Sequence, residues 1–264
     1  MESIKTYFAL ALADVRSQMQ HKASFVLGAM GNFCGTIIDF LGIWTLFASF
    51  GALDGWTLPE IAVLYGVINV SFTIAEAMGR GFDLFAGMVK SGDFDRVLLR
   101  PRGTLFQVLA GRLELTRLGR LTQGAGVLAL GIATQPQGMG AGQLGLLALC
   151  IAGGVMLFLG LLMMQAAMCF WTVESLEAFN VLTYGGVTMA SYPLSVYRGW
   201  FRRFFLYVVP LGCLNYLPAA VLFGKSLPYP SFTAYLAPLA GGLFLLAGAL
   251  VWQLGVRHYR SAGA

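Results

Sequence analysis

Charged residues are scarce in this chain. Of its 264 residues, 17 are Lys or Arg and 12 are Asp or Glu, so only 11% are charged, against about 25% in soluble domains. Water would solvate a globule of this composition poorly, which argues against a soluble enzyme. In place of charge, 58% of the residues are hydrophobic, and many form runs of about 20 residues, the length of a membrane-spanning helix. The composition therefore predicts an all-α integral membrane protein.

Residues that usually build active sites and metal sites are also rare. The four cysteines lie in apolar runs without a CxxC pair, which predicts that they pack as small hydrophobic residues. The two histidines, His21 and His258, lie at predicted membrane edges, away from any cluster of ligands. The nearest match to a phosphate-binding loop ends at Gly224-Lys225-Ser226, but Ala219 occupies the place of its first glycine. We therefore expect no catalytic residue, no metal site and no cofactor bound by this chain.

The net charge of +5 does not indicate a nucleic-acid partner. The positive side chains flank apolar runs, whereas nucleic-acid binding is typical of a basic face with interleaved aromatic residues. Their positions suit contact with the headgroups of a lipid bilayer.

Six apolar segments are long enough to be membrane spans, and we expect one transmembrane domain over residues 1–264. The predicted spans cover residues 24–50, 58–78, 118–135, 144–171, 178–197 and 235–255. Residues 1–22 have an amphipathic pattern that predicts a helix lying in the membrane interface. The alternative is that these residues only extend the first span into the cytosol.

Residues 204–224 form a further apolar run that is long enough to cross but contains Pro210, Asn215 and Pro218. If this run crossed, the chain would have seven spans and its termini would lie on opposite sides. With six spans, 13 of the 17 Lys and Arg residues lie on the inner side together with both termini, as the positive-inside rule favours. We therefore predict a re-entrant hairpin at the outer surface, and cytosolic N- and C-termini.

Asp39 lies near the middle of the first predicted span, where a charge costs about 2.5–3.5 kcal/mol. Its side chain should therefore face protein or water. It either hydrogen-bonds to Asn or Thr on a neighbouring helix or stays protonated, or it is a counter-charge for a cationic substrate in a transport path. On the same span, Gly31 and Gly35 form a GxxxG pair that allows two helices to approach closely. With 34 glycines in the chain, such a pair is weak evidence by itself.

Residues 82–92 predict a short helix on the cytosolic side with one apolar face. This face contains Phe82, Phe85, Met88 and Val89, and the helix should end at Gly92. An apolar face on the water side needs a partner, either another protein or the lipid headgroups.

Further along this side, the acidic and basic residues Asp95 and Arg96 follow the short helix. Glu114 and Arg117 are spaced to form an ion pair on a later helix.

Three stretches in order resemble the permease subunits of type-2 ATP-binding-cassette (ABC) exporters, in a bacterial branch of them. They are SGDFDRVLLRPR (Ser91 to Arg102), SYPLSVY (Ser191 to Tyr197) and LNYLPA (Leu214 to Ala219), together with Trp200 and Arg202. The resemblance covers nearly the whole chain.

This resemblance implies a partnership in the cytoplasmic membrane of a bacterium. Two permeases, of the same or different chains, would pair, and two cytosolic ATPase subunits would bind ATP and Mg beneath them. The permease would form the substrate path for export and hydrolyse nothing itself.

The resemblance also implies roles for particular residues. The coupling helix that inserts into the ATPase corresponds to residues 82–92, with Asp95 and Arg96 following it. The re-entrant hairpin corresponds to residues 204–224, with Pro210, Asn215, Tyr216 and Pro218. The dimer face would be formed by the first and fifth spans and would include Gly31 and Gly35.

Two other functions remain open on the residues alone. The chain could be a self-contained secondary transporter or channel in which Asp39 carries protons or cations, although no inverted repeat is evident. It could also be a membrane assembly partner without a transport path of its own.

Overall fold

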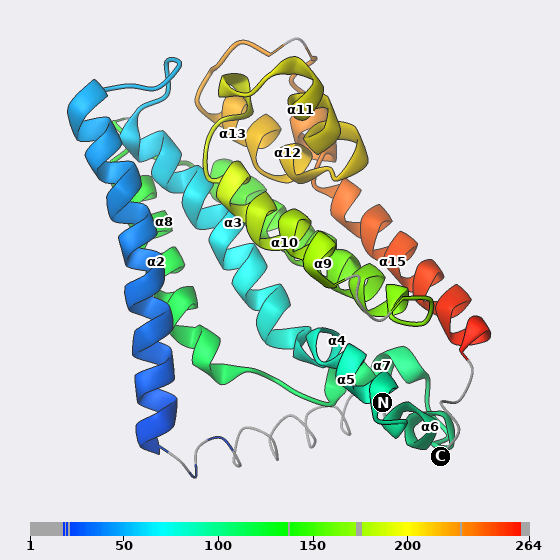
Figure 1. Cartoon of the computed structure of the whole chain (residues 1–264). Coiled ribbons are helices and arrows are strands. Elements are labelled where there is room, and N and C mark those ends of the chain that lie inside the picture. The colour runs from blue at the N-terminus through cyan, green and yellow to red at the C-terminus, as the bar shows by residue number, and fades with distance from the viewer. Residues whose placement is uncertain are drawn as a thin grey trace.

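A computed structural model describes residues 18, 20, 22–136, 138–172, 176–227 and 229–259. These residues form helices joined by turns and contain no strand, so the all-α class is confirmed for this part of the chain (Figure 1). The predicted interfacial helix over residues 1–22 lies almost entirely outside the described residues.

Four helices are long and apolar enough to cross a membrane, and they agree with four of the predicted spans. They are α2 (Lys22–Phe50), α3 (Leu58–Met78), α9 (Ala141–Met168) and the continuous stretch Thr233–His258, which comprises α14 (Thr233–Leu236) and α15 (Leu239–His258). Thr57 begins α3 as its N-cap, and the Glu60 side chain bonds back to the Thr57 amide, which fixes where this span starts.

The other two predicted spans are shorter than expected. α8 (Leu118–Ala133) has 16 residues and α10 (Leu176–Ala190) has 15, about 24 Å at a rise of 1.5 Å per residue. The prediction that the fifth span reaches residue 197 is wrong, because α10 ends at Ala190 and a turn leads to Pro193 and a short 3-10 helix, η2 (Leu194–Val196). A proline disfavours the helical backbone conformation in the residue before it, so the helix ends before Pro193. Six full-length spans are therefore not confirmed by the helix lengths.

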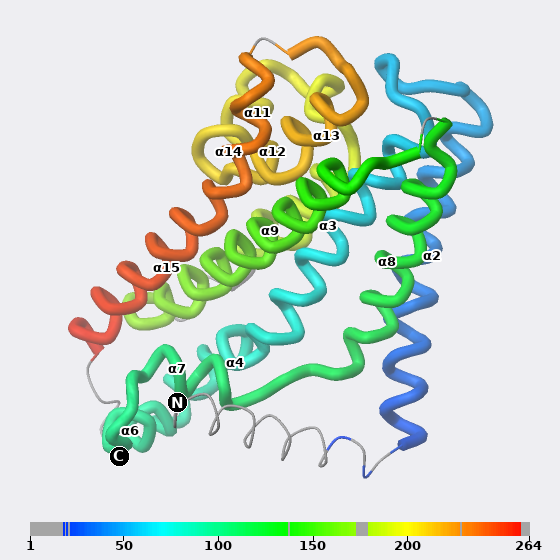
Figure 2. The backbone as a smooth tube through the Cα atoms, turned by 180° about the vertical axis from the view of Figure 1, so that it is seen from behind, coloured from blue at the N-terminus to red at the C-terminus, as the bar shows by residue number. Residues whose placement is uncertain are grey.

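The apolar run that was expected to break does break, and it starts earlier than predicted. It comprises α11 (Gly199–Arg203), the π-helical turn η3 (Phe204–Val208), α12 (Leu211–Leu214) and α13 (Tyr216–Leu222). The two halves on either side of Pro210 are bent by 75°. We call residues 199–222 the broken run; Figures 1 and 2 show its helices gathered at one end of the bundle, opposite the short helices α4 to α7.

The long helices pack side by side, with α9 between α3 and α15, and α8 between α3 and α2 (Figures 1 and 2). Glycines let α9 and α15 approach closely. A Cβ atom added to Gly248 on α15 would lie only 2.7 Å from the Gly160 carbonyl oxygen on α9, and Gly241 meets Gly153 in the same way. Small residues at this spacing permit backbone contact between membrane helices.

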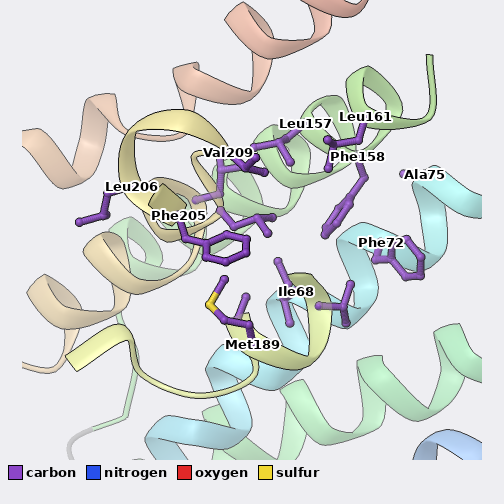
Figure 3. Close-up of a cluster of buried hydrophobic side chains, with 14 of the residues drawn as sticks. Ile68, Phe72, Ala75, Leu157, Phe158, Leu161, Met189, Phe205, Leu206 and Val209 are labelled. Atoms are coloured by element: carbon purple, nitrogen blue, oxygen red, sulfur yellow. The ribbon is translucent and has the colours of Figure 1, made fainter. Parts of the chain in front are cut away.

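The largest hydrophobic core joins α3, α9 and α10 to the broken run (Figure 3). Phe72 of α3 and Phe158 of α9 form an edge-on pair with centroids 4.9 Å apart. The Asn215 side chain, only 4% exposed, donates hydrogen bonds to the Leu64 carbonyl at 3.2 Å and the Ala190 carbonyl at 2.7 Å. The buried polar group is thus satisfied, and it fixes the broken run to α3 and α10.

Candidate functional site

Four short helices follow α3 and form a compact body at the end of the bundle away from the broken run (Figure 1). They are α4 (Arg80–Asp83), α5 (Phe85–Lys90), α6 (Asp93–Leu98) and α7 (Thr104–Ala110), and we call residues 80–110 the α4–α7 segment. Gly92 lies between α5 and α6 with φ of +73°, a conformation that costs glycine little. Its predicted position at the end of a helix is confirmed.

Phe82 and Phe85 lie in an aromatic cluster inside the chain, and neither is exposed. The Phe85 ring lies 4.8 Å from Trp252 of α15 and 5.1 Å from Phe170, which follows α9. Phe94 of α6 completes the cluster, with its ring 5.1 Å from that of Phe85.

The expectation that this apolar face lacks a partner within the chain is therefore wrong. The covering residues come from segments far away in the sequence, and the indole of Trp252 also donates a hydrogen bond to Thr104 Oγ1 at 3.1 Å. Burial of aromatic rings of this size contributes strongly to stability. The cluster fastens the α4–α7 segment to α9 and α15.

The other predicted coupling residues reach the surface to different degrees. Met88, Val89, Gly92 and Asp95 are partly buried, and Arg96 is exposed. Arg96 pairs with Asp93 at 3.4 Å, and 80% of the Arg96 side chain is accessible.

Sequence reasoning did not single out two exposed apolar residues close by. Leu98 and Leu99 end α6 and are 42% and 85% exposed. A cavity of about 450 Å³ opens beside α5, with Met88, Val97 and Gln107 among its lining residues.

A buried ionic cluster lies where α3 meets the α4–α7 segment and α8. Glu76, only 1% exposed, receives the Arg117 guanidinium at 3.0 Å and the Arg120 guanidinium at 3.9 Å. The Tyr184 hydroxyl of α10 donates a hydrogen bond to the same carboxylate. Glu76 thus joins three elements, and a charge this deeply buried is stable only with such partners.

The cluster extends outward through Arg117 to the α4–α7 segment. Arg117 lies 3.5 Å from Glu114, and Glu114 lies 3.0 Å from Arg80 of α4. The predicted Glu114–Arg117 pair is confirmed. Arg117 also donates to Asn32 of α2 at 3.3 Å, so that a chain of charged side chains connects α4 with α2, α3, α8 and α10.

Arg120 extends the cluster along α3. It donates to Asn69 Oδ1 at 3.1 Å, and its guanidinium lies 4.8 Å from the centre of the Phe72 ring, a distance at which a cation and an aromatic face attract each other. We use the name ionic cluster for Arg80, Glu76, Glu114, Arg117 and Arg120.

Sequence reasoning placed Glu76 only near the end of a span and did not predict this cluster. The sequence does indicate that such a cluster exists, because a carboxylate and two arginines at the ends of apolar helices require partners. The pairing itself depends on how α3 and α8 pack.

Asp83 of α4 adjoins the ionic cluster and lies 3.5 Å from Arg80. The pKa of the Asp83 carboxyl is raised from 3.8 to about 6, mainly by burial and also by the negative charge of Glu76, against the lowering effect of Arg80 and Arg117. Asp83 is thus the group of this site whose charge changes just below neutral pH.

Asp39 lies on the exposed side of α2, while Thr36 and Phe40 of the same helix are buried. Within the described residues it forms no hydrogen bond or ion pair, so the expected bond to Asn or Thr of a neighbouring helix is not seen. Its carboxylate interacts electrostatically with Tyr65 and Tyr192.

Gly31 and Gly35 are also exposed on α2, and among the described residues a Cβ atom added to either would meet nothing within 4 Å. The described part of the chain therefore does not use this close-approach motif. Only 22% of an 18-residue apolar stretch of α2 is buried among the described residues, compared with 83% of the corresponding stretch of α3, so most of this stretch of α2 is available to lipid or to another chain.

The hairpin residues occupy distinct places in the broken run. Pro210 lies at the bend, Asn215 holds the run to α3 and α10, and Pro218 is buried within α13. The Tyr216 ring lies 5.8 Å from that of Trp56, which precedes α3.

Metal binding has no support among the described residues, where no group of three or more His, Cys, Asp or Glu could hold an ion. The four cysteines are free. Cys150 and Cys169 are buried as predicted, but Cys34 is exposed on α2.

Comparison with known protein families gives one match. The model of the family described as "ABC-2 family transporter protein" matches residues 33–263. This range includes the α4–α7 segment, the ionic cluster and the broken run. No curated protein and no solved structure matches the chain.

Proposed function

The chain belongs to the ABC-2 family of transporters, and from this we propose that it is the permease subunit of an ABC exporter. In this proposal it forms the substrate path in the cytoplasmic membrane of a bacterium, with both termini in the cytosol. Separate ATPase subunits bind ATP and Mg and supply the energy. The broken run is a re-entrant hairpin at the outer surface, and the α4–α7 segment lies in the cytosol.

One observation carries the proposal: the α4–α7 segment is a folded body that is fastened to the spans. The aromatic cluster joins it to α9 and α15, and the Arg80–Glu114–Arg117 chain joins it to α3 and α8. Separating Arg117 from Glu76, which is only 1% exposed, leaves an uncompensated buried charge, which is costly. A displacement of α4 by an ATPase would therefore move the spans as well, as coupling of ATP hydrolysis to transport requires.

The surface that meets the ATPase, in this proposal, is the exposed side of α5 and α6. It includes the predicted residues Met88, Val89, Gly92, Asp95 and Arg96, extended by Leu98 and Leu99. Exposed apolar residues next to charged ones are typical of protein interfaces. Phe82 and Phe85 would support this surface from inside and would not contact the ATPase.

A second permease, of the same or a different chain, would pack on the exposed face of α2 around Gly31 and Gly35. Asp39 would then lie beside this interface, where a carboxylate could meet a cationic group of the substrate. Transport by Asp39→Asn should then lose its preference for cationic substrates. An unchanged substrate range would remove Asp39 from the path.

The test uses the tagged chain purified from its native membranes, with vanadate-sensitive ATP hydrolysis of the preparation as the readout. Leu99→Asp should lower the hydrolysis recovered per permease at least fivefold, because Leu99 is 85% exposed in the chain and would be covered by the ATPase in this proposal. Phe232→Asp is the matched control, since Phe232 is 61% exposed at the opposite end of the bundle.

Each result decides the proposal. Loss of hydrolysis in Leu99→Asp with retention in Phe232→Asp supports it. Full recovery of hydrolysis in Leu99→Asp, or equal loss in the control, would remove the assignment of this surface. A wild-type chain that brings down no ATPase would favour a self-contained transporter.

A further inference from the structure

Lys225 directly follows the broken run and makes three contacts with the start of α3 and the turn before it. Its ammonium lies 2.8 Å from Glu60 Oε1 and donates a hydrogen bond to the Gly55 carbonyl at 2.7 Å. It also lies 5.3 Å from the centre of the Trp56 ring, within the range of a cation–π attraction. A single cation therefore joins the end of the broken run to the region between α2 and α3.

The turn before α3 is shaped to present this site. Asp54 and Gly55 have φ of +50° and +76°, and Leu53 and Trp56 exchange backbone hydrogen bonds at 3.0 and 2.9 Å. Two successive residues with positive φ make the tight turn of a β-hairpin, in which glycine is strongly preferred. The Gly55 carbonyl of this turn accepts the hydrogen bond from Lys225.

The two carboxylate oxygens of Glu60 have separate tasks. Oε2 accepts a hydrogen bond from the Thr57 amide at 2.8 Å and so caps α3, while Oε1 pairs with Lys225. A glutamine at this position keeps one oxygen for the cap and loses the charge. The ion pair can therefore be removed without removing the helix cap.

The broken run is thus held at two points of very different strength. Between α12 and α13, the buried Asn215 amide bonds to two backbone carbonyls, and its loss would leave them unsatisfied. At the end, 24% of the Lys225 side chain is exposed, and partly exposed ion pairs contribute little net stability. If one point is released during function, it is the Lys225 point, with Asn215 as the pivot.

There is also space for such a movement. A cavity of about 480 Å³ borders the end of α13, lined by Glu60, Gln135, Gln143 and residues 221–224. The end of α13 therefore borders open volume next to Glu60, the partner of Lys225.

We propose that the Lys225–Glu60 ion pair is a releasable latch that holds α13 closed against the start of α3. This rests on the proposed function, in which opening at this end of the bundle clears the exit for substrate. Lys225 and Glu60 are positioning residues here and need not touch the substrate.

The test measures the labelling rate of single cysteines by N-ethylmaleimide in the full-length protein in lipid nanodiscs, where both faces are accessible. The reporter is Ala220→Cys, because Ala220 of α13 is completely buried. The control reporter is the native Cys213 on α12, on the other side of Asn215. In each protein the remaining cysteines are replaced by alanine.

Lys225→Met and Glu60→Gln should each raise the labelling rate at residue 220 at least threefold and leave Cys213 unchanged. Lys225→Arg, which keeps the charge, should label as the wild type does. Hydrogen exchange of the α13 amides, compared with those of α12, repeats the comparison without the engineered cysteine.

Three results would overturn the latch: equal rates in all variants, equal acceleration at both reporters, or acceleration in Lys225→Arg. The measurement requires neither ATP nor substrate. A negative result would therefore remove the latch and leave the proposed permease function standing, which is tested separately by ATPase recovery.

Discussion

The Glu76 carboxylate and the Arg117 guanidinium meet at 3.0 Å where α3 ends and α8 begins, with Glu76 almost fully buried. This pair is the centre of the ionic cluster, because Arg117 also reaches Glu114 and Asn32. In the exporter mechanism proposed above, this pair connects the α4–α7 segment to the spans.

Arg117→Met should destabilise the protein by about 3 kcal/mol, because it leaves the buried Glu76 without its closest cation. The readout is the midpoint of thermal unfolding in detergent. Arg96→Met is the matched control: it also removes one partner of an ion pair spaced by three residues, but the Arg96 side chain is 80% accessible, so the cost should stay below about 1 kcal/mol. Similar losses in both variants would contradict the role assigned to burial.

Asp83 should make stability depend on pH. Since the pKa of its carboxyl is about 6 in the folded chain and 3.8 as the ordinary value, the folded state holds the proton more tightly. The contribution of Asp83 to the free energy of unfolding should therefore fall by up to about 3 kcal/mol as pH rises from about 4 to 6. Above about pH 6 this contribution should stay low.

Asp83→Asn should remove this pH-dependent contribution to the free energy of unfolding. The variant should be at least as stable as the wild type at pH 7.5, because Arg80 keeps its ion pair with Glu114 at 3.0 Å. The measurement is hydrogen exchange of the α4–α7 amides between pH 5 and 7.5, corrected for intrinsic exchange rates. An identical pH dependence in both proteins would show that Asp83 is not the responsible group.

Gly248→Ala should weaken the packing of α15 on α9 by about 1–3 kcal/mol, because the added methyl group meets backbone that cannot move aside. Gly242→Ala is the control on the same helix, as its Cβ would meet only the Met156 sulfur at 3.9 Å. Unfolding midpoints of the two variants give the comparison. An unaffected Gly248→Ala would mean that the two helices are not in backbone contact.

Gly35→Leu should disrupt pairing with a second permease without unfolding the chain, because nothing in the chain lies within 4 Å of the added Cβ atom. Chemical crosslinking in native membranes detects the pair, whether the partner is the same or another chain. Gly126→Leu on α8 has equally free surroundings and should leave the crosslink intact. Retention of the crosslink in Gly35→Leu would remove this face from the interface.

The local features of the fold were predictable from the sequence. Apolar run length located the four long spans to within a few residues, and proline located the break at Pro210. The glycine that ends α5 and the Glu114–Arg117 pair were predictable because both depend only on neighbouring residues.

The features that depend on distant contacts were not predictable. The periodicity of residues 82–92 shows which face is apolar, but only the fold shows that Trp252 and Phe170 cover it. Likewise, Lys225 and Glu60 are each unremarkable at the end of an apolar run. Their pairing requires the broken run to turn back toward the start of α3, and no local rule fixes that path.

The aromatic cluster has a consequence for how the protein is made. Phe82, Phe85 and Phe94 leave the ribosome early, whereas Trp252 arrives with the last helix. Until that helix is inserted, Phe170 and residues of α9 cover these rings only in part, because Trp252 is still missing. If the proposed function holds, biosynthesis therefore completes the surface that meets the ATPase only after α15 has been inserted.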